Sequence, residues 1–233
     1  MSEKLNYDIV ILTTSVTRPE LHSSVFSNID KFLDGYNCKW IISIDKVLGG
    51  SLKETKDNFY KILDYDNIDL TIRDHSNEAS RMSWYKSVRY CIEEGYKYNP
   101  SFGYLWLEDD WTSNFDKSLK QHVSSIDNLS QENFFISLVN RGGQLNFNPS
   151  IWSKDLFKKY MYDKITTLPT PPIPNAERLC VYTNLEYGYT EKKPESVSNI
   201  NTYGLSLFKD VGRNWSSKQM RGRRTFHIEG HDF

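Results

Sequence analysis

Cysteine is scarce in this chain, and its pattern argues against two kinds of small-protein architecture. The 233 residues contain three cysteines, Cys38, Cys91 and Cys180, which lie far apart in the sequence. No C-x-x-C pair occurs, so neither a zinc knuckle nor a disulfide framework is indicated. We expect reduced, mostly buried thiols, as is usual in the cytosol.

An excess of one charge and a long apolar run are also missing. Twenty-nine basic and 30 acidic residues leave a formal net charge of −1, which argues against a dedicated nucleic-acid-binding protein. No apolar run approaches the ~18 residues that cross a bilayer, and the polar start "MSEKLNYD" differs from a secretory signal. We therefore expect a cytoplasmic protein without a transmembrane segment, either complete or a module of a larger protein.

Apolar runs alternate with helical patterns through the first half of the chain. Strands are expected in "YDIVILTTSV", "KWIISIDK", "IDLTIRDHS" and "YLWLEDD", with helices at 19–33, 51–64 and 77–94 between them. This β-α-β-α-β-α-β order predicts an α/β fold with right-handed crossovers and a mainly parallel sheet. Ligands bind such sheets outside the carboxyl ends of the strands.

The second half is less regular. A strand is expected at 133–139, a turn and a further strand in "GGQLNFNPSIW", and helices in "SKDLFKKYMYDK" and "NAERLCVYTNLEYG". A stiff proline-rich loop, "TTLPTPPIPN", separates these two helices, and a tail rich in basic, aromatic and glycine residues follows from Val197. Because no internal repeat or low-complexity linker occurs, we expect one domain, 1–233, with a nucleotide-binding half at 1–115 and an acceptor-binding half at 116–233.

Three carboxylates follow the fourth expected strand directly. In "YLWLEDDWTSN" the strand-forming residues end in Glu108, Asp109 and Asp110, whose like charges repel and raise one another's pKa values. A hard divalent cation such as Mg²⁺ or Mn²⁺, which prefers oxygen ligands and binds phosphates, would relieve this repulsion. The alternative is a helix N-terminus with Asp110 as its cap in a solvated turn.

Several of these segments resemble a known enzyme family. "YDIVILTTSVTRP", a strand that ends at Asp45, a helix that carries Arg81, and "LWLEDDW" are similar to the GT-A (Rossmann-like) fold of nucleotide-sugar glycosyltransferases. The resemblance covers most of residues 5–185 and is strongest to small domains of large DNA viruses and bacteria, so a virus-encoded protein in the host cytoplasm is compatible with it. The acidic triplet stands where the family has its D-x-D motif, with Glu108 in place of the first Asp.

The resemblance implies roles for individual residues. Thr13, Thr14 and Arg18 would border the base and ribose, Asp45 would accept a hydrogen bond from uracil or guanine, and Asp110 would bind the metal ion. The full implied set of donor-binding residues in this part of the chain is Thr13, Thr14, Arg18, Asp45, Arg81, Glu108 and Asp109. Asp45 has an alternative role as a strand-terminal turn residue, and Arg81 as a surface arginine of its helix.

The basic tail is the second candidate for donor binding. Its cationic residues are Arg213, Lys218, Arg221, Arg223 and Arg224, and His227 and His231 follow them. Arginine forks bind phosphate oxygens, a mobile segment can close over a donor, and either histidine would complete the metal shell, as a third ligand does in many GT-A enzymes. The alternative is a solvated tail, or one that meets acidic lipid.

An inverting transfer also needs a carboxylate base for the acceptor hydroxyl. Glu177, after the proline-rich loop, has the matching place in the resemblance, and Asp155 is the reserve. Their alternatives are a first-turn glutamate stabilised by the helix dipole and a structural helix start capped by Ser153. Aromatic faces often bind sugars, so Trp111 and Trp152 are the candidates for acceptor contact.

These residues together predict an enzyme that depends on Mn²⁺ or Mg²⁺. It would transfer a sugar from a nucleotide-sugar donor, with UDP as the first choice of nucleotide, to the hydroxyl of a glycan or another acceptor. Two alternatives stay open. A sugar-1-phosphate nucleotidyltransferase would need a glycine-rich loop, which "TTSVTRPE" lacks, and a non-catalytic nucleotide-sugar-binding module would keep the fold without turnover.

Overall fold

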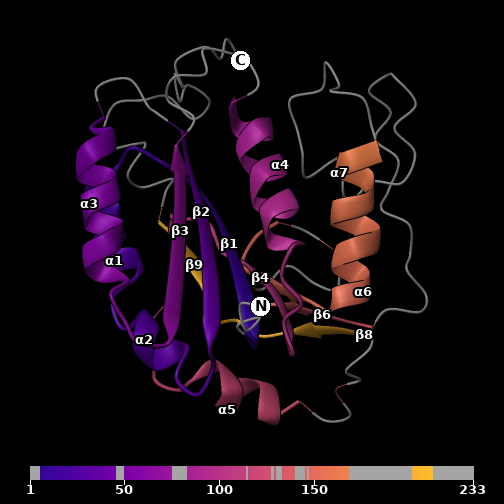
Figure 1. Ribbon diagram of the computed structural model, residues 1–233. Helices are drawn as coiled ribbons and strands as arrows, with labels where there is room; N and C mark the ends of the chain where they lie inside the picture. The colour runs from indigo at the N-terminus through magenta and orange to yellow at the C-terminus, as the bar shows by residue number, and fades with distance from the viewer. Residues whose placement is uncertain are drawn as a thin grey trace.

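A seven-stranded sheet forms the centre of the protein in the computed structural model (Figure 1). The structure describes residues 6–45, 50–74, 83–113, 115–126, 129, 133–139, 145, 147–167 and 201–211. The strand order is β3-β2-β1-β4-β7-β6-β8. The bounds are β1 Ile9–Val16, β2 Cys38–Asp45, β3 Ile68–Asp74, β4 Gly103–Trp106, β6 Phe134–Ser137, β7 Ser150–Trp152 and β8 Asn201–Gly204.

The sheet is mainly parallel. β3, β2, β1 and β4 run in one direction, β7 is antiparallel to both β4 and β6, and β6 is parallel to β8. In this described sheet β7 alone is therefore reversed. The edge at which β1 to β4 end is called the carboxyl edge below, and the opposite edge is called the amino edge.

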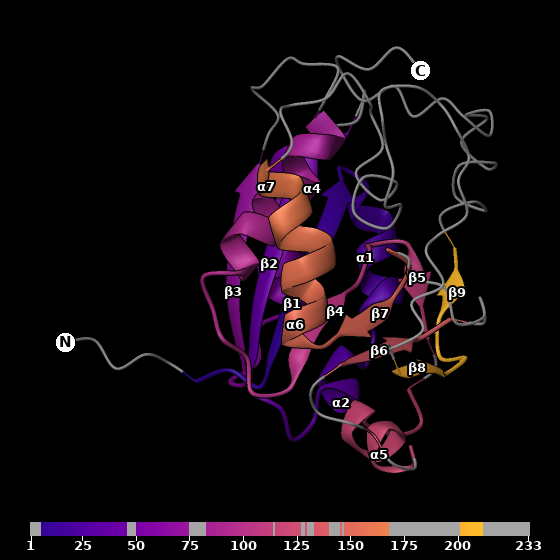
Figure 2. The same cartoon turned by 90° about the vertical axis from the view of Figure 1, so that its right-hand side faces the viewer.

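Helices cover both faces of the sheet (Figure 1). One face carries α1 (Pro19–Val25), α2 (Ile29–Phe32), α3 (Leu52–Ile62) and α5 (Leu119–Ser124). The other carries α4 (Ser83–Gly95), then α6 (Lys154–Phe157), a π-helical segment (Lys158–Tyr162) and α7 (Asp163–Thr167) in succession, as Figure 2 shows. Within the described stretches, no helix is both long enough and apolar enough to cross a membrane.

Alternating side chains of the central strands build two separate cores. Ile9 and Ile11 of β1 pack toward the face of α1 to α3, whereas Val10 and Leu12 pack toward α4. A strand buried on both faces is apolar at most positions, which explains the apolar run IVIL that opens β1. The strand β3 lies at the end of the sheet and is only half-buried.

The predicted α/β class with a mainly parallel sheet and flanking helices is confirmed. Two boundaries differ from the prediction. The helix expected at 19–33 is broken into α1 and α2, because Asn28 between them adopts a left-handed conformation with φ 61°. The fourth strand ends at Trp106, so the three carboxylates lie in the turn that follows it, before β5 (Trp111–Thr112).

The tail also contributes structure that the sequence pattern did not predict. β8 extends the main sheet, and β9 (Lys209–Asp210) pairs with β5 in a separate two-stranded sheet. In the second half, the helix expected after the proline-rich loop lies outside the described residues.

Candidate functional site

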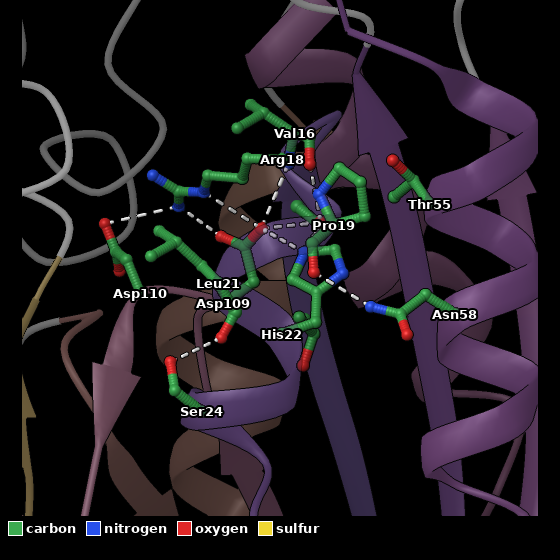
Figure 3. Close-up of polar contacts among 12 residues, drawn as sticks. Val16, Arg18, Pro19, Leu21, His22, Ser24, Thr55, Asn58, Asp109 and Asp110 are labelled. Atoms are coloured by element: carbon green, nitrogen blue, oxygen red, sulfur yellow. Dashed lines mark hydrogen bonds and ion pairs between the residues drawn. The ribbon is translucent and has the colours of Figure 1, made fainter. Parts of the chain in front are cut away.

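Asp109 is the centre of a buried polar network at the carboxyl edge (Figure 3). Its side chain is 2% exposed. Oδ2 accepts hydrogen bonds from Ser15 Oγ at 2.7 Å, from the backbone N–H of Val16 at 3.3 Å and from Arg18 Nε at 3.2 Å. Arg18 Nη2 donates to Oδ1, and His22 Nε2 lies 3.2 Å from Oδ2. These hydrogen bonds link the segment 108–110, called the acidic turn below, to the turn between β1 and α1.

The network keeps Asp109 ionised. Burial alone would raise the pKa of this carboxyl, but the charge of Arg18 and the hydrogen bonds from His22 and Arg18 outweigh it and hold the pKa well below its ordinary range. Oδ2 already accepts several hydrogen bonds and the side chain is 2% exposed, so little of this carboxylate is open to a substrate. The predicted contact of Asp109 with the donor is therefore not favoured by its placement.

Arg18 is a buried cation shared between two aspartates. Its side chain is 6% exposed, and Nη2 lies 3.3 Å from Asp110 Oδ2 in addition to its bond with Asp109. Burial would lower the pKa of the guanidinium, but Asp109 and Asp110 raise it further above its ordinary value. Because so little of Arg18 is exposed, its placement argues against the predicted contact with the base and ribose.

Asp110 differs from Asp109 because one of its carboxylate oxygens has no hydrogen-bond donor among the described residues. Oδ2 meets Arg18, whereas Oδ1 is buried and has no hydrogen-bond partner among the described residues. Burial and the charges of Asp109 and Asp210 raise the pKa of Asp110 to about 6, against the opposing effect of Arg18. The side chain as a whole is 26% exposed, although Oδ1 itself is buried.

A strand pair holds the acidic turn from its far side. The backbone N–H of Val211 donates to the carbonyl of Asp110 at 2.8 Å, and Trp111 of β5 pairs with Asp210 of β9. Asp210 therefore comes close to the acidic turn although it is 100 residues later in the chain. Sequence reasoning missed Asp210, and no local pattern in "SLFKDVG" identifies it as a partner of β5.

Thr13 and Thr14 lie inside the structure. Thr13 is fully buried, and its hydroxyl donates to the carbonyl of Leu107 at 2.5 Å while accepting from Trp40 Nε1 at 2.9 Å. This placement makes Thr13 a link between β1, β2 and the turn after β4, and argues against the predicted contact with a nucleotide. Thr14 is 6% exposed and offers little more surface.

Asp45 ends β2 at the same edge of the sheet. Its side chain is buried, and its backbone carbonyl accepts a hydrogen bond from Thr17 at 3.2 Å. Burial and the charge of Asp45 raise the pKa of the Cys91 thiol well above its ordinary value, and Cys38 is likewise a buried free thiol. Both are thus buried free thiols, as expected, and Cys180 lies outside the described residues.

Glu108 and the two candidate tryptophans also have defined places. Glu108 is half-buried and accepts from Trp111 Nε1 at 3.3 Å. Trp111 is 7% exposed and packs in the core, and Trp152 is fully buried, with Nε1 donating to Ser150 at 2.9 Å. Neither tryptophan offers a ring face to a sugar, so both placements argue against the predicted acceptor contacts.

Asp155 lies at the edge of the sheet opposite the acidic turn. It is exposed in the first turn of α6, which begins directly after β7. Because β7 is reversed, its last residue, Trp152, pairs with Tyr104 near the start of β4. Asp155 is therefore at the amino edge, a full strand length from the acidic turn, and its placement argues against a role as reserve base.

His22 is a site residue that the prediction did not include. It is fully buried, stacks on Phe59 with ring centroids 4.2 Å apart, and turns Nε2 toward Asp109. The available signal was its spacing from Arg18, since residues four apart lie on one face of a helix.

The other predicted site residues lie outside the described residues. They are Arg81, Glu177, Arg213, Lys218, Arg221, Arg223, Arg224, His227 and His231. In the part of the chain that is described, no group of three or more His, Cys, Asp or Glu side chains is arranged to hold a metal ion. A cation at the acidic turn would therefore need ligands from elsewhere in addition to Asp110.

Comparison with known proteins finds no matching family model and no matching curated protein. Among solved structures, the chain is similar to the mannosyltransferase PcManGT from Pyrobaculum calidifontis in complex with GDP-Man and Mn²⁺, with a TM-score of 0.46 and 8% identity over 66% of this chain and 46% of that one. TarS of S. aureus gives a TM-score of 0.44 and 11% identity, over 65% of this chain and 29% of that one.

Core-mannan synthase A from Aspergillus fumigatus, in its Mn/GDP form, gives a TM-score of 0.31 and 10% identity, over 73% of this chain and 51% of that one. The chain thus spans between 29% and 51% of the lengths of these three proteins. All three TM-scores are below 0.5, so these likenesses carry no argument about function.

Proposed function

We propose that the chain is a glycosyltransferase that binds a nucleotide-sugar donor and a divalent cation at the carboxyl edge and transfers the sugar to a hydroxyl acceptor. The observation that carries this proposal is the state of Asp110. One of its oxygens is buried without a hydrogen-bond donor in the described structure, although it belongs to a partly exposed carboxylate beside two other acids. An oxygen in this position is suited to a cation.

The described residues fit a cation that is shared with the donor. The carboxylate of Asp109 is engaged by Arg18, Ser15 and His22. Asp110 is therefore the carboxylate that would hold Mn²⁺ or Mg²⁺. Mg²⁺ commonly binds through one or two carboxylates together with substrate phosphates and waters, so a single ligand here suits a cation that arrives with a diphosphate. When bound, such a cation neutralises the charge that develops on the leaving nucleoside diphosphate.

The remaining predicted residues complete the proposal. Asp45 would accept a hydrogen bond from the base, with UDP as first choice and GDP as second. Arg81 and the tail arginines would bind the diphosphate, and His227 or His231 would add a metal ligand. We retain one domain, with the donor at 1–115 and the acceptor at 116–233.

Glu177 is proposed as the base of an inverting transfer. The chain reaches the carboxyl edge at the end of α7, at Thr167, ten residues before Glu177 in the sequence (Figure 2). A carboxylate that deprotonates an acceptor hydroxyl must lie on this edge, where the donor would bind. Asp155 does not lie on this edge, so Glu177 is the base that we propose.

A thermal-shift panel tests the proposal. UDP and GDP are added with and without Mn²⁺ to the wild type and to Asp110→Asn. We expect a nucleoside diphosphate to raise the unfolding temperature only with Mn²⁺, and Asp110→Asn to lose this shift while unfolding at an undiminished temperature without ligand. A shift that is independent of both Mn²⁺ and Asp110 would contradict the metal-dependent proposal.

Release of sugar then separates enzyme from binding module. Incubation with UDP-sugars and GDP-sugars should give slow hydrolysis, with water replacing the acceptor. Nucleotide-dependent stabilisation without any release of sugar would favour the non-catalytic module. Formation of pyrophosphate from a nucleoside triphosphate and a sugar 1-phosphate would favour the nucleotidyltransferase.

A further inference from the structure

Arg18 contacts both aspartates of the acidic turn, and the contacts are not equivalent. Nε and Nη2 donate to the two oxygens of Asp109, while Nη2 also lies 3.3 Å from Asp110 Oδ2. A guanidinium is planar and presents its donors in a fixed fork. Once two of its nitrogens are bound to Asp109, the direction from which it meets Asp110 is fixed as well.

We propose that Arg18 is a positioning residue for the cation site: it holds Oδ2 of Asp110 and so leaves Oδ1 as the oxygen that meets the cation. This inference rests on the proposed function. Arg18 acts through Asp110 and does not contact the donor, since its side chain is 6% exposed. Asp109, Ser15 and His22 are then the support that holds Arg18 in place.

The buried environment makes this orientation stable. Asp109 is 2% exposed and Arg18 6%, so both partners are shielded from competing water. Asp109 receives three further contacts, from Ser15 Oγ, the Val16 N–H and His22 Nε2, which fix its own rotamer. Outer residues that orient a metal ligand in this way typically change metal affinity by about 10–100-fold when they are replaced.

The competing expectation is that Arg18 merely repels the cation. A positive charge near a metal site weakens binding by Coulomb repulsion, and its removal would then tighten binding. In this site Asp109 compensates the charge of Arg18 at direct contact. The loss of orientation should therefore outweigh the loss of repulsion, and the two expectations have opposite signs.

The experiment measures the affinity for Mn²⁺ by electron paramagnetic resonance of the free ion, with UDP or GDP present. Arg18→Lys keeps the charge but removes the planar fork, and we expect it to bind Mn²⁺ roughly tenfold more weakly than the wild type. Lys56→Gln is the control for loss of positive charge at this edge. Lys56 pairs with Asp74 at the end of β3, so this substitution removes a cation from the same edge without touching the acidic turn. This control should bind Mn²⁺ as the wild type does.

A second variant guards against a folding defect. Arg18→Gln combined with Asp109→Asn removes both charges of the buried ion pair, so neither is left buried without the other, which is the costly case. We expect it to unfold cooperatively and also to bind Mn²⁺ about tenfold more weakly. Affinity equal to or tighter than that of the wild type, in this variant or in Arg18→Lys, would overturn the positioning role.

Crystal structures of the metal-free wild type and Arg18→Lys separate this inference from the proposed function. If the wild type binds no Mn²⁺ with either nucleotide, the metal-dependent function fails. The positioning claim is still decided by the side chain of Asp110: a changed rotamer in Arg18→Lys supports it, and an unchanged rotamer overturns it.

Discussion

The guanidinium of Arg18 and the carboxylate of Asp109 form a two-point ion pair between residues that are 91 positions apart in the sequence. Arg18 lies in the turn between β1 and α1, and Asp109 lies in the turn after β4. The pair therefore joins two neighbouring loops of the carboxyl edge into one unit. Both side chains are almost fully buried, so this junction is part of the core as well as part of the candidate site.

Removal of Asp109 should destabilise the protein severely. Asp109→Ala would leave Arg18 buried without its counter-ion, and breaking a buried pair from one side costs about 3–5 kcal/mol. We expect the free energy of unfolding, measured by urea titration near neutral pH, to fall by that amount. Asp109→Asn should cost less, because the amide still accepts a hydrogen bond from Arg18 or Ser15.

An exposed ion pair provides the control for this comparison. Glu93 pairs with Arg89 at 2.8 Å across one helical turn of α4, with side chains 40% and 33% exposed. Glu93→Ala should cost no more than about 0.5 kcal/mol, as is usual for such pairs. Equal losses for Glu93→Ala and Asp109→Ala would show that the buried network contributes nothing special to stability.

Asp110 should make the metal-free protein less stable at neutral pH. Its pKa of about 6 in the folded chain exceeds the value of about 3.9 for an unfolded aspartate. Between these values the folded state binds more protons than the unfolded state, so the contribution of Asp110 to stability falls as the pH rises from about 4 to about 6. Asp110→Asn removes this dependence.

Urea titrations in the presence of a chelator check this sign. Asp110→Asn should exceed the wild type by on the order of 1–2 kcal/mol at about pH 7.5, and the difference should vanish near about pH 4. Asp109 is present in both proteins, so its own loss of stability at acidic pH cancels in the comparison. A difference that grows on acidification would mean that the folded pKa of Asp110 is not raised.

Thr13 should matter for stability and not for nucleotide binding. Thr13→Val would leave Trp40 Nε1–H buried without its acceptor, which costs about 1–3 kcal/mol. A double-mutant cycle with Trp40→Phe should give a coupling energy above about 0.5 kcal/mol, since the two residues are in contact. Nucleotide affinity that falls in Thr13→Val, measured well below its unfolding temperature, would restore Thr13 to the donor site.

The sheet could be predicted because its signal is local and strong. β1 and β2 are buried on both faces, so their sequences contain the apolar runs IVIL and WII, and the helical patterns between the strands impose parallel crossovers. The short strands β8 and β9 carry no such signal. β8 has mostly exposed residues and β9 has two residues, so their pairing depends on partners that are distant in sequence.

The acidic turn shows why site roles are harder to predict than folds. Like-charge repulsion led to the prediction that Glu108, Asp109 and Asp110 hold a divalent cation, and in the described structure Arg18, from another turn, pairs with Asp109 and Asp110. Sequence spacing cannot distinguish a protein cation from a metal ion. Sequence spacing also cannot show that β7 is reversed, and Asp155 lies at the amino edge because of this reversal.

The two candidate bases should respond differently to the same change. Asp155→Asn and Glu177→Gln each remove one negative charge with little change in volume, and they are matched in this respect. Asp155 lies at the edge opposite the acidic turn, so its variant should keep the transfer rate of the wild type.

Glu177→Gln should lose about 10²–10⁴-fold in kcat, as expected when general base catalysis is removed, while the Mn²⁺-dependent thermal shift with nucleoside diphosphate stays unchanged. Transfer assays with the donor identified from the thermal-shift panel measure both rates. Normal turnover of Glu177→Gln would place the base elsewhere, and a slow Asp155→Asn would require a second site at the amino edge.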